Sequence, residues 1–363
     1  MARLVEAACP RPISGLVVAR RGEVADGLRT PVAWANHPIP DQSSVDAGAR
    51  LLDIAAAAGP ADDVIVLLSG GASALACLPS PGLAIAKKAA LTAALLRSGA
   101  TVEEINTVRR HLSRIKGGRL AAAAHRARVT TYAISDVISD RAEAIGSGLT
   151  VADPTTIADA ETVLARYGIA TPACGFSESM KPGDSRLARA EFHIIASART
   201  AHAALLAAAR AQGFKSISLG ADLEGEARAI GARHAEIARA CAAHGRPFAI
   251  ISGGELTVSV TGSGRGGPNF ECAAALAIGV SGLDGVAALA ADSDGVDGNS
   301  GAAGAFVDGS TAARAQRAGF NLETALRNND CAAAFDAIGG SFAPGMTGTN
   351  VNDIRIILVG GSG

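Results

Sequence analysis

A turn rich in glycine and serine follows an early apolar run. The run Val64–Leu68 (VIVLL) leads directly into Ser69, Gly70, Gly71 and Ser73. Between a strand and a helix, such a turn leaves backbone N–H groups and hydroxyls available to an anion. Tight turns also need glycine for steric reasons alone, and the lysine of a Walker A loop is missing. The segment therefore indicates either an anion site or an ordinary strand-to-helix turn.

The densest positive cluster lies at residues 105–119 (INTVRRHLSRIKGGR). At helical spacing its apolar residues form one stripe, which predicts a helix with Arg110 and Lys116 on the polar face. Such a face is usually no more than solvated. However, the chain contains only five lysines, so these two side chains are the natural candidates to neutralise a phosphate.

Carboxylates follow two other apolar runs. Asp136 and Asp140 come after 129–134 (VTTYAI), where a carboxylate can hold a metal ion, accept a proton from a hydroxyl, or cap a helix. A second loop, 291–298 (ADSDGVDG), holds three carboxylates, among them Asp294 and Asp297. Because closely spaced like charges usually meet a cation, we expect Asp294 and Asp297 to be metal ligands.

The segment 262–267 (GSGRGG) matches G-x-G-x-x-G and raises an NAD-dependent dehydrogenase as a rival function. Arg265 and Pro268 do not suit a turn that must pack against a pyrophosphate, so a nucleotide loop of another kind or a hairpin is equally compatible. Near the C-terminus, Asn350 lies in TGTNVND, which forms either a polar pocket or a simple turn.

The order of these segments predicts the fold that positions them. Apolar runs alternate with alanine-rich helical stretches, which is typical of an α/β fold with mainly parallel strands and ligand-binding loops at one sheet edge. The 363 residues indicate two domains, with a boundary near His244–Pro247. A net charge of −1 and 3% aromatic residues argue against nucleic-acid binding. The chain lacks an apolar run long enough for a membrane span, and its six scattered cysteines suit the cytoplasm.

Taken in order, six blocks of the sequence resemble the glycerate 2-kinase family, the class II kinases whose C-terminal part is called the MOFRL domain. The blocks are LLSGGASAL, INTVRRHLSRIKGGRLA, SDVISD with GSGLTVADPTT, ISGGELTVSVTGSGRGGPN, ADSDGVDGNSGAAGAFVDG and TGTNVNDIRI. The resemblance implies a Rossmann-like N-terminal domain over 1–245, with a mainly parallel sheet flanked by helices. It also implies an α/β MOFRL domain over 246–363 and an active site in the cleft between the two.

The activity implied by the resemblance is transfer of the γ-phosphoryl group of ATP to the 2-hydroxyl of D-glycerate, with Mg²⁺, giving 2-phosphoglycerate. The partners are then two small molecules, with no nucleic acid and no membrane, and a homodimer is allowed. Some members are named hydroxypyruvate reductase through an association with tartrate utilisation, so an NAD(P)H-dependent reductase is the alternative. Phosphoryl transfer fits the residues better, because it needs positive groups, Mg²⁺ and a carboxylate near the attacking hydroxyl.

The motifs and the resemblance together assign the expected site residues. The catalytic set is Asp136, Asp140, Lys116 and Arg110, and the metal ligands are Asp294 and Asp297. The residues expected to bind substrate or nucleotide are Ser69, Gly70, Gly71, Ser73, Gly253, Gly254, Glu255, Arg265, Asn269 and Asn350.

Two departures from the family pattern lead to a third expectation, a catalytically impaired member that binds without turnover. Family members begin with a further strand and a G-x-G-K-A turn, and this chain opens on what resembles the segment after it. The family's G-G-R-N-x-E is here Gly266-Gly267-Pro268-Asn269-Phe270-Glu271, so one arginine is replaced by proline.

Overall fold

The computed structural model describes residues 1–23, 26–245 and 247–360. The chain divides into two compact units, one formed by residues 1–133 and 140–195 and the other by residues 134–139 and 196–363. The expected boundary between residues 245 and 246 therefore falls inside the second unit. The physical reason is strand pairing, because β6 (Lys215–Ser218) joins the same sheet as β8 (Phe248–Thr257).

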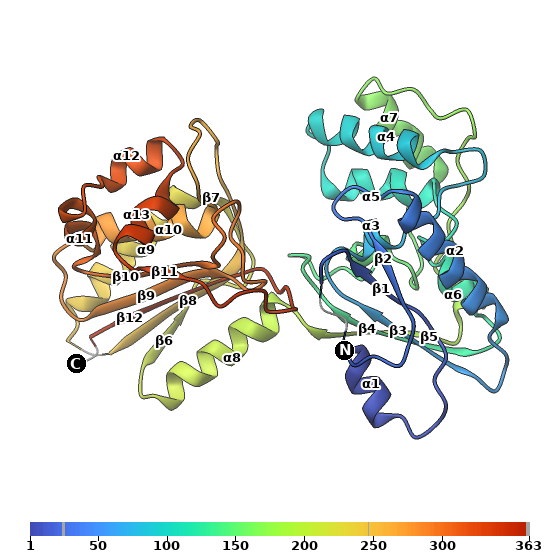
Figure 1. The fold of residues 1–363 in the computed structure, drawn as a ribbon, viewed down its shortest axis with the longest axis horizontal. Helices are drawn as coiled ribbons and strands as arrows, with labels where there is room; N and C mark the ends of the chain where they lie inside the picture. Colours follow the sequence, from blue (N-terminus) through green and yellow to red (C-terminus); the bar gives the residue numbers. More distant parts are fainter. Residues whose placement is uncertain (24–25, 246, 361–363) are drawn as a thin grey trace. The chain divides into compact units, whose positions relative to one another are not determined.

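The first unit is built on parallel strands. β3 (Asp63–Leu68), β4 (Arg128–Ile134) and β5 (Ala190–Ala196) form one sheet in that order, with β3 and β4 parallel. β1 (Val17–Arg20) and β2 (Val32–Ala35) form a separate parallel pair. The helices are α1 (Ala2–Ala8), α2 (Gln42–Ala57), α3 (Ala72–Leu75), α4 (Ile85–Arg97), α5 (Val102–His111), α6 (Arg119–Ala123) and α7 (Ile157–Arg166), with short 3₁₀ turns η1 (Ile145–Ser147) and η2 (Ser185–Leu187). This arrangement, seen in Figure 1, agrees with the predicted parallel sheet flanked by helices.

The second unit contains a mixed sheet, so the mainly parallel pattern expected for the N-terminal domain does not extend to it. Its strand order is β11-β10-β9-β12-β8-β6, and β7 also pairs with β8. Only β6 and β7 run parallel to β8, whereas β8, β12, β9, β10 and β11 pair antiparallel. The chain passes from β9 to its antiparallel neighbour β10 through the loop 293–303, with no crossover helix between them. The remaining bounds are β7 (Leu223–Glu226), β9 (Val286–Asp292), β10 (Gly304–Asp308), β11 (Ser341–Phe342) and β12 (Asp353–Val359).

Helices cover both faces of this sheet (Figure 1). α9 (Ala227–Ala242) and α10 (Pro268–Gly279) lie on one face with α11 (Thr311–Arg317), α12 (Leu322–Arg327) and α13 (Cys331–Ala337), and α8 (Ala198–Ala211) lies on the other. α9 and α10 pack closely because Gly231 has no side chain. A Cβ added there would lie 2.3 Å from the Cys272 carbonyl oxygen. The buried alanines of both helices extend this packing into one apolar core between these helices and the sheet.

The predicted helix over residues 105–119 is wrong in its second half. α5 begins at a capping box between Thr101 and Glu104 and ends at His111. The chain then turns through Gly117 and Gly118, which have φ of 60° and 79°, and α6 begins at Arg119. Lys116 therefore lies in a buried loop instead of on a solvated helix face.

The six cysteines are free thiols, four of them buried. Within the described ranges, no helix is long and apolar enough to cross a membrane.

Candidate active site

A cavity of about 100 Å³ in the second unit is lined almost entirely by carboxylates and amides. Its lining residues are Asp136, Glu255, Asp292, Asn350, Asn352 and Asp353. The strand register explains part of this cluster, because Asp353 pairs with Asp292 on one side and with Gly254, the neighbour of Glu255, on the other. The structure thus brings together three of the predicted residues, Asp136, Glu255 and Asn350.

Crowding and burial favour protonated carboxyl groups in this cavity. Burial, together with the charges of Asp294 and Asp353, raises the pKa of Asp292 to about 7. Loss of surrounding water and the charges of Asp353 and Asp136 also raise the pKa of Glu255, although its side chain keeps contact with solvent. A carboxyl group with a pKa near neutrality can exchange a proton with a bound hydroxyl at physiological pH.

A buried network fixes the orientation of Asp353. Asn269 donates from Nδ2 to Asp353 Oδ1 at 2.6 Å, and Arg355 pairs with Asp353 Oδ2 at 3.2 Å. Burial raises the pKa of Asp353 in spite of the Arg355 charge. The Arg355 guanidinium also donates to Ser252 Oγ at 3.1 Å and to the Gly253 carbonyl at 2.7 Å, so it ties β12 to β8 directly behind the cavity. Asn269, predicted as a binding residue, therefore holds a cavity carboxylate in place.

Gly253 and Gly254 serve the packing of the sheet. A Cβ at Gly254, whose φ is +106°, would lie 2.2 Å from the Leu223 carbonyl oxygen of β7. Gly253 donates its amide to the Gly220 carbonyl at 2.9 Å. Both glycines are buried, and their position explains the residue type without a nucleotide.

The predicted metal ligands lie in a structural loop. Asp297 accepts hydrogen bonds from the backbone amides of Asn269 and Phe270, at 3.1 and 2.9 Å, so it caps the start of α10. Asp294 accepts a bond from the Val296 amide at 2.8 Å. Among the described residues, no group of three or more His, Cys, Asp or Glu side chains is arranged to hold a metal ion.

The glycine loop at 262–267 is explained by close packing. Added Cβ atoms at Gly262 and Gly264 would lie 2.3 Å from Asn328 and Asp330 atoms, and one at Gly267 would lie 2.5 Å from the Asp297 carboxyl carbon. A dinucleotide fingerprint is therefore not needed to account for these glycines.

Arg265 and Pro268 each have a role within the fold. The Arg265 guanidinium pairs with Asp336 and donates to the Ser300 carbonyl at 3.0 Å, so the predicted binding side chain is engaged within the fold. Pro268 is the first residue of α10, a position where the missing N–H and fixed φ of proline are well tolerated.

In the first unit, a buried lysine donates hydrogen bonds to Ser73, the last residue of the predicted anion-binding turn. Lys116 Nζ donates to the carbonyl and hydroxyl oxygens of Ser73, at 2.9 and 3.1 Å. Burial lowers the pKa of Lys116 well below its ordinary value. The hydroxyl of Ser73 also lies 2.8 Å from that of Ser147, which donates to Asn106. The structure thus joins two predicted residues, Ser73 and Lys116, and adds Ser147 and Asn106.

The rest of the predicted turn is tight and leads into a short helix. Gly71 has φ of +82°, and an added Cβ there would lie 3.0 Å from the His37 ring. The helix that follows Ser69, Gly70 and Gly71 is α3, which is only four residues long. Glycine at position 71 is therefore required by the backbone whether or not an anion binds.

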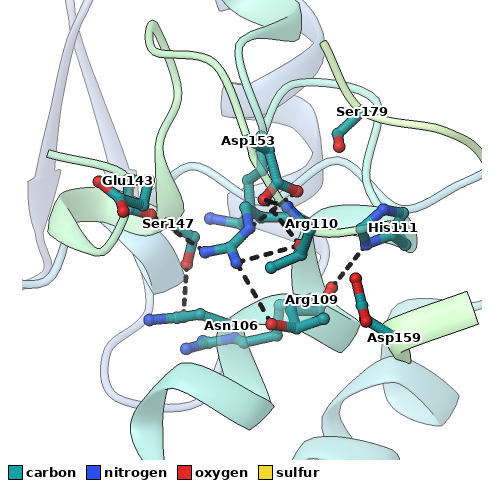
Figure 2. A network of polar contacts seen from close by, with 12 residues as sticks. Asn106, Arg109, Arg110, His111, Glu143, Ser147, Asp153, Asp159 and Ser179 are labelled. Atoms are coloured by element: carbon teal, nitrogen blue, oxygen red, sulfur yellow. Dashed lines mark hydrogen bonds and ion pairs between the residues drawn. The ribbon is translucent and has the colours of Figure 1, made fainter. Parts of the chain in front are cut away.

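Arg110 is committed to an internal ion pair (Figure 2). Its Nε lies 3.0 Å from Asp153 Oδ2, and both side chains are at most 5% exposed. Burial alone would raise the pKa of Asp153, but the Arg110 charge and bonds from Thr155 lower it below the ordinary value. Arg110 also donates to the Glu143 carbonyl at 3.2 Å. Its predicted catalytic role thus competes with a structural one.

Asp136 and Asp140 belong to different compact units. Asp136 belongs to the second unit, in which Ser135 donates its amide to the Ala196 carbonyl at 2.8 Å. Asp140 belongs to the first unit and has φ of +52°. Asp136 lines the carboxylate cavity, and Asp140 does not.

A larger cavity, of about 360 Å³, lies in the first unit between residues 150–152 and 183–192. None of the predicted site residues lines it. The carboxylate cavity therefore remains the better candidate for chemistry.

Sequence reasoning missed Asp292, Asn352, Asp353 and Arg355 as site residues. Asp292 and Asp353 lie at the end of one strand and the start of another, in segments already recognised as polar. Their antiparallel register was the missing information, because it places two distant segments side by side.

Two family models match the chain. Residues 1–174 match a domain of unknown function, DUF4147, and residues 248–353 match the MOFRL family. A protein of Agrobacterium vitis, whose name assigns hydroxypyruvate reductase activity only provisionally, is 43% identical over 99% of this chain and 84% of its own length. The D-glycerate 2-kinase of Thermotoga maritima is 39% identical over 95% of this chain and 84% of its own.

A solved structure shows the same relationship. The crystal structure of glycerate kinase from Thermotoga maritima matches with a TM-score of 0.90 and 36% identity, covering 99% of this chain and 88% of that one. Similarity of this extent joins both units of the chain to one family. The chain therefore belongs to the glycerate 2-kinase family and carries a MOFRL domain in its C-terminal part.

Proposed function

We propose that this protein transfers the γ-phosphoryl group of ATP to the 2-hydroxyl of D-glycerate, giving 2-phosphoglycerate and ADP. Family membership supports the choice of reaction, since a relative at 39% identity is named for it. The observation that carries the proposal is the carboxylate cavity, where Asp292, with a pKa of about 7, lies beside Asp136. The attacking hydroxyl needs a proton acceptor, and these two carboxylates supply candidates.

Charge in the first unit is proposed to act at the Ser69–Ser73 turn. Lys116 lies beneath this turn and donates to Ser73. Burial lowers its pKa, and the negative charge of a phosphate bound at the turn would favour its ammonium form, which would then neutralise part of the phosphate charge. Arg110 is paired with Asp153 and is proposed to hold the neighbouring segments in place. The predicted active site in a cleft between domains stays a prediction, as do the cytoplasmic location and the homodimer.

We propose that Mg²⁺ binds together with ATP, and that the protein alone does not supply all of its ligands. The described residues contain no group of three metal ligands, and kinases usually bind Mg²⁺ through one or two carboxylates and the phosphates. When bound, the ion would neutralise phosphate charge. Asp136 and Asp292, which share the cavity, are the side chains most suited to approach it.

The test is ATP-dependent phosphorylation of D-glycerate by the whole chain, measured by coupled ADP release. Asp136→Asn and Asp292→Asn each remove one candidate proton acceptor, and we expect kcat to fall about 100-fold or more for the one that serves as base. Asp284→Asn alters an exposed aspartate of the same unit and should leave kcat unchanged.

Two results would contradict the proposal. One is normal phosphorylation by both cavity variants. The other is oxidation of NADH or NADPH with hydroxypyruvate in the absence of ATP, which would favour the reductase named for the Agrobacterium relative.

A further inference from the structure

Asn352 combines three features that are unusual in one side chain. Its φ is +64°, a left-handed conformation that is uncommon outside glycine and that asparagine tolerates better than most residues. Its side chain is only 6% exposed, and its amide nitrogen Nδ2 has no hydrogen-bond partner within the described ranges. It also lines the carboxylate cavity.

The backbone holds this residue in place from both sides. The Asn352 amide donates to Asn350 Oδ1 at 2.8 Å, and the Ser293 amide donates to the Asn352 carbonyl at 3.3 Å. Asp353, the next residue, enters β12 and is fixed by Asn269 and Arg355. Strain and an unsatisfied buried donor each cost free energy, and structures that retain both usually do so at functional sites.

The neighbouring groups define what the Asn352 amide can bind. The cavity presents carboxylates from Asp136, Glu255, Asp292 and Asp353. A ligand carboxylate placed against Asn352 would be repelled by them, and a carbonyl could accept from Asn352 but give nothing to a carboxylate. A hydroxyl can do both, because it accepts one hydrogen bond and donates another.

We propose that Asn352 is a substrate-binding residue that donates from Nδ2 to a hydroxyl of the ligand, while a cavity carboxylate accepts that hydroxyl's proton. This assignment rests on the proposed function, in which the hydroxyl is the phosphoryl acceptor of glycerate. The bond from Asn352 occupies one lone pair and leaves the other to form the new O–P bond. The bond from the γ-phosphorus to the ADP oxygen breaks, and the hydroxyl proton passes to the carboxylate.

The experiment measures equilibrium binding by calorimetry, with a non-hydrolysable ATP analogue present. The ligands are D-glycerate and propionate, which lacks both hydroxyls. In Asn352→Gly the donor is lost but the positive φ becomes unstrained, so the variant should fold with a thermal midpoint no lower than that of the wild type. We expect its affinity for glycerate to fall about tenfold while any weak binding of propionate is unchanged. Asn352→Asp keeps the shape, adds a negative charge and should weaken glycerate binding further.

Asn329→Gly is the matched control, because Asn329 is also buried and has φ of +54°. Its side chain is used by the fold, donating to Glu271 Oε1 at 2.6 Å. We expect this variant to lose thermal stability and to keep its affinity for glycerate. Equal binding of glycerate by the wild type and Asn352→Gly, or failure of the wild type to bind it, would overturn the assignment. Glycerate binding that depends on Asn352 without phosphoryl transfer would instead contradict only the proposed function.

Discussion

Asp297 illustrates how the environment of a single carboxylate changes its role. It is only 1% exposed, and its carboxylate accepts hydrogen bonds from two backbone amides at the start of α10. Burial nevertheless raises its pKa from 3.8 to about 7, so the folded protein binds a proton there more readily than the unfolded chain does. The stability contributed by this proton is complete below about pH 4 and is lost as the pH rises through about 7.

We therefore expect the free energy of unfolding of the wild type, relative to Asp297→Asn, to decrease by about 2 kcal/mol between pH 5.5 and pH 8. Comparison with the variant cancels the contribution of Asp292, whose pKa is also raised to about 7. Calorimetry at both pH values measures the difference. A constant difference between the two proteins would show that Asp297 titrates at its ordinary pKa.

The residue types of the site could be predicted better than their partners. Asp136, Glu255 and Asn350 were expected at a binding site, and they line one cavity. Arg110 and Arg265 were expected to face ligands, but they pair with Asp153 and Asp336, which lie 43 and 71 residues away in sequence. From sequence alone, a basic side chain in a motif is expected to bind a ligand anion. Only the fold shows that a carboxylate distant in sequence forms an ion pair with it.

At the scale of elements, β8 depends on a close approach by β7. Gly254 pairs with Leu223, and its φ of +106° excludes most side chains. In Gly254→Ala the new methyl group would lie 2.2 Å from the Leu223 carbonyl oxygen. The substitution therefore causes both backbone strain at a positive φ and a steric clash with β7. We expect a loss of about 4 kcal/mol in unfolding free energy, the sum of these two costs. Glu255 follows directly, so glycerate phosphorylation should fall as well.

Gly282→Ala separates the two costs. Gly282 has a similar positive φ of +72°, but an added Cβ would meet nothing within 4 Å. This control should lose only about 1 kcal/mol and keep its activity. Urea denaturation of both variants checks the comparison, and equal losses would mean that the approach of β7 to β8 contributes little.

Strands with long apolar runs were predicted correctly, and strands defined by their neighbours were not. β3 and β4 match the apolar runs 64–68 and 129–134 within one residue. β7 (LEGE) contains two acidic residues and a glycine, and it exists because β8 offers it a parallel partner. The predicted helix over 105–119 failed for a related reason, since Gly117 and Gly118 adopt positive φ and end the helical register.

At the scale of the whole molecule, the two compact units have cores of their own. The described apolar cluster around α5 and α7 lies within the first unit, and the cluster around α9 and α10 lies within the second. Residues 134–139 belong to the second unit although the chain before and after them belongs to the first. Length and composition predicted two domains. They could not predict that residues 134–139 belong to the second unit, because contacts with residues distant in sequence determine the unit of a short segment.

Separate cores predict separate unfolding transitions, each sensitive to substitutions in its own unit. Lys116→Met would remove the buried ammonium group that donates to the carbonyl and hydroxyl oxygens of Ser73, so we expect the first unit to lose about 2 kcal/mol, or about 4–8 °C in its melting midpoint. Gly254→Ala should lower only the midpoint of the second unit, and Lys87→Met, at an exposed lysine, should lower neither. Differential scanning calorimetry of the full chain resolves these shifts. A single transition lowered by both Lys116→Met and Gly254→Ala would instead mean that the two units unfold as one, because cooperativity would then extend across both cores.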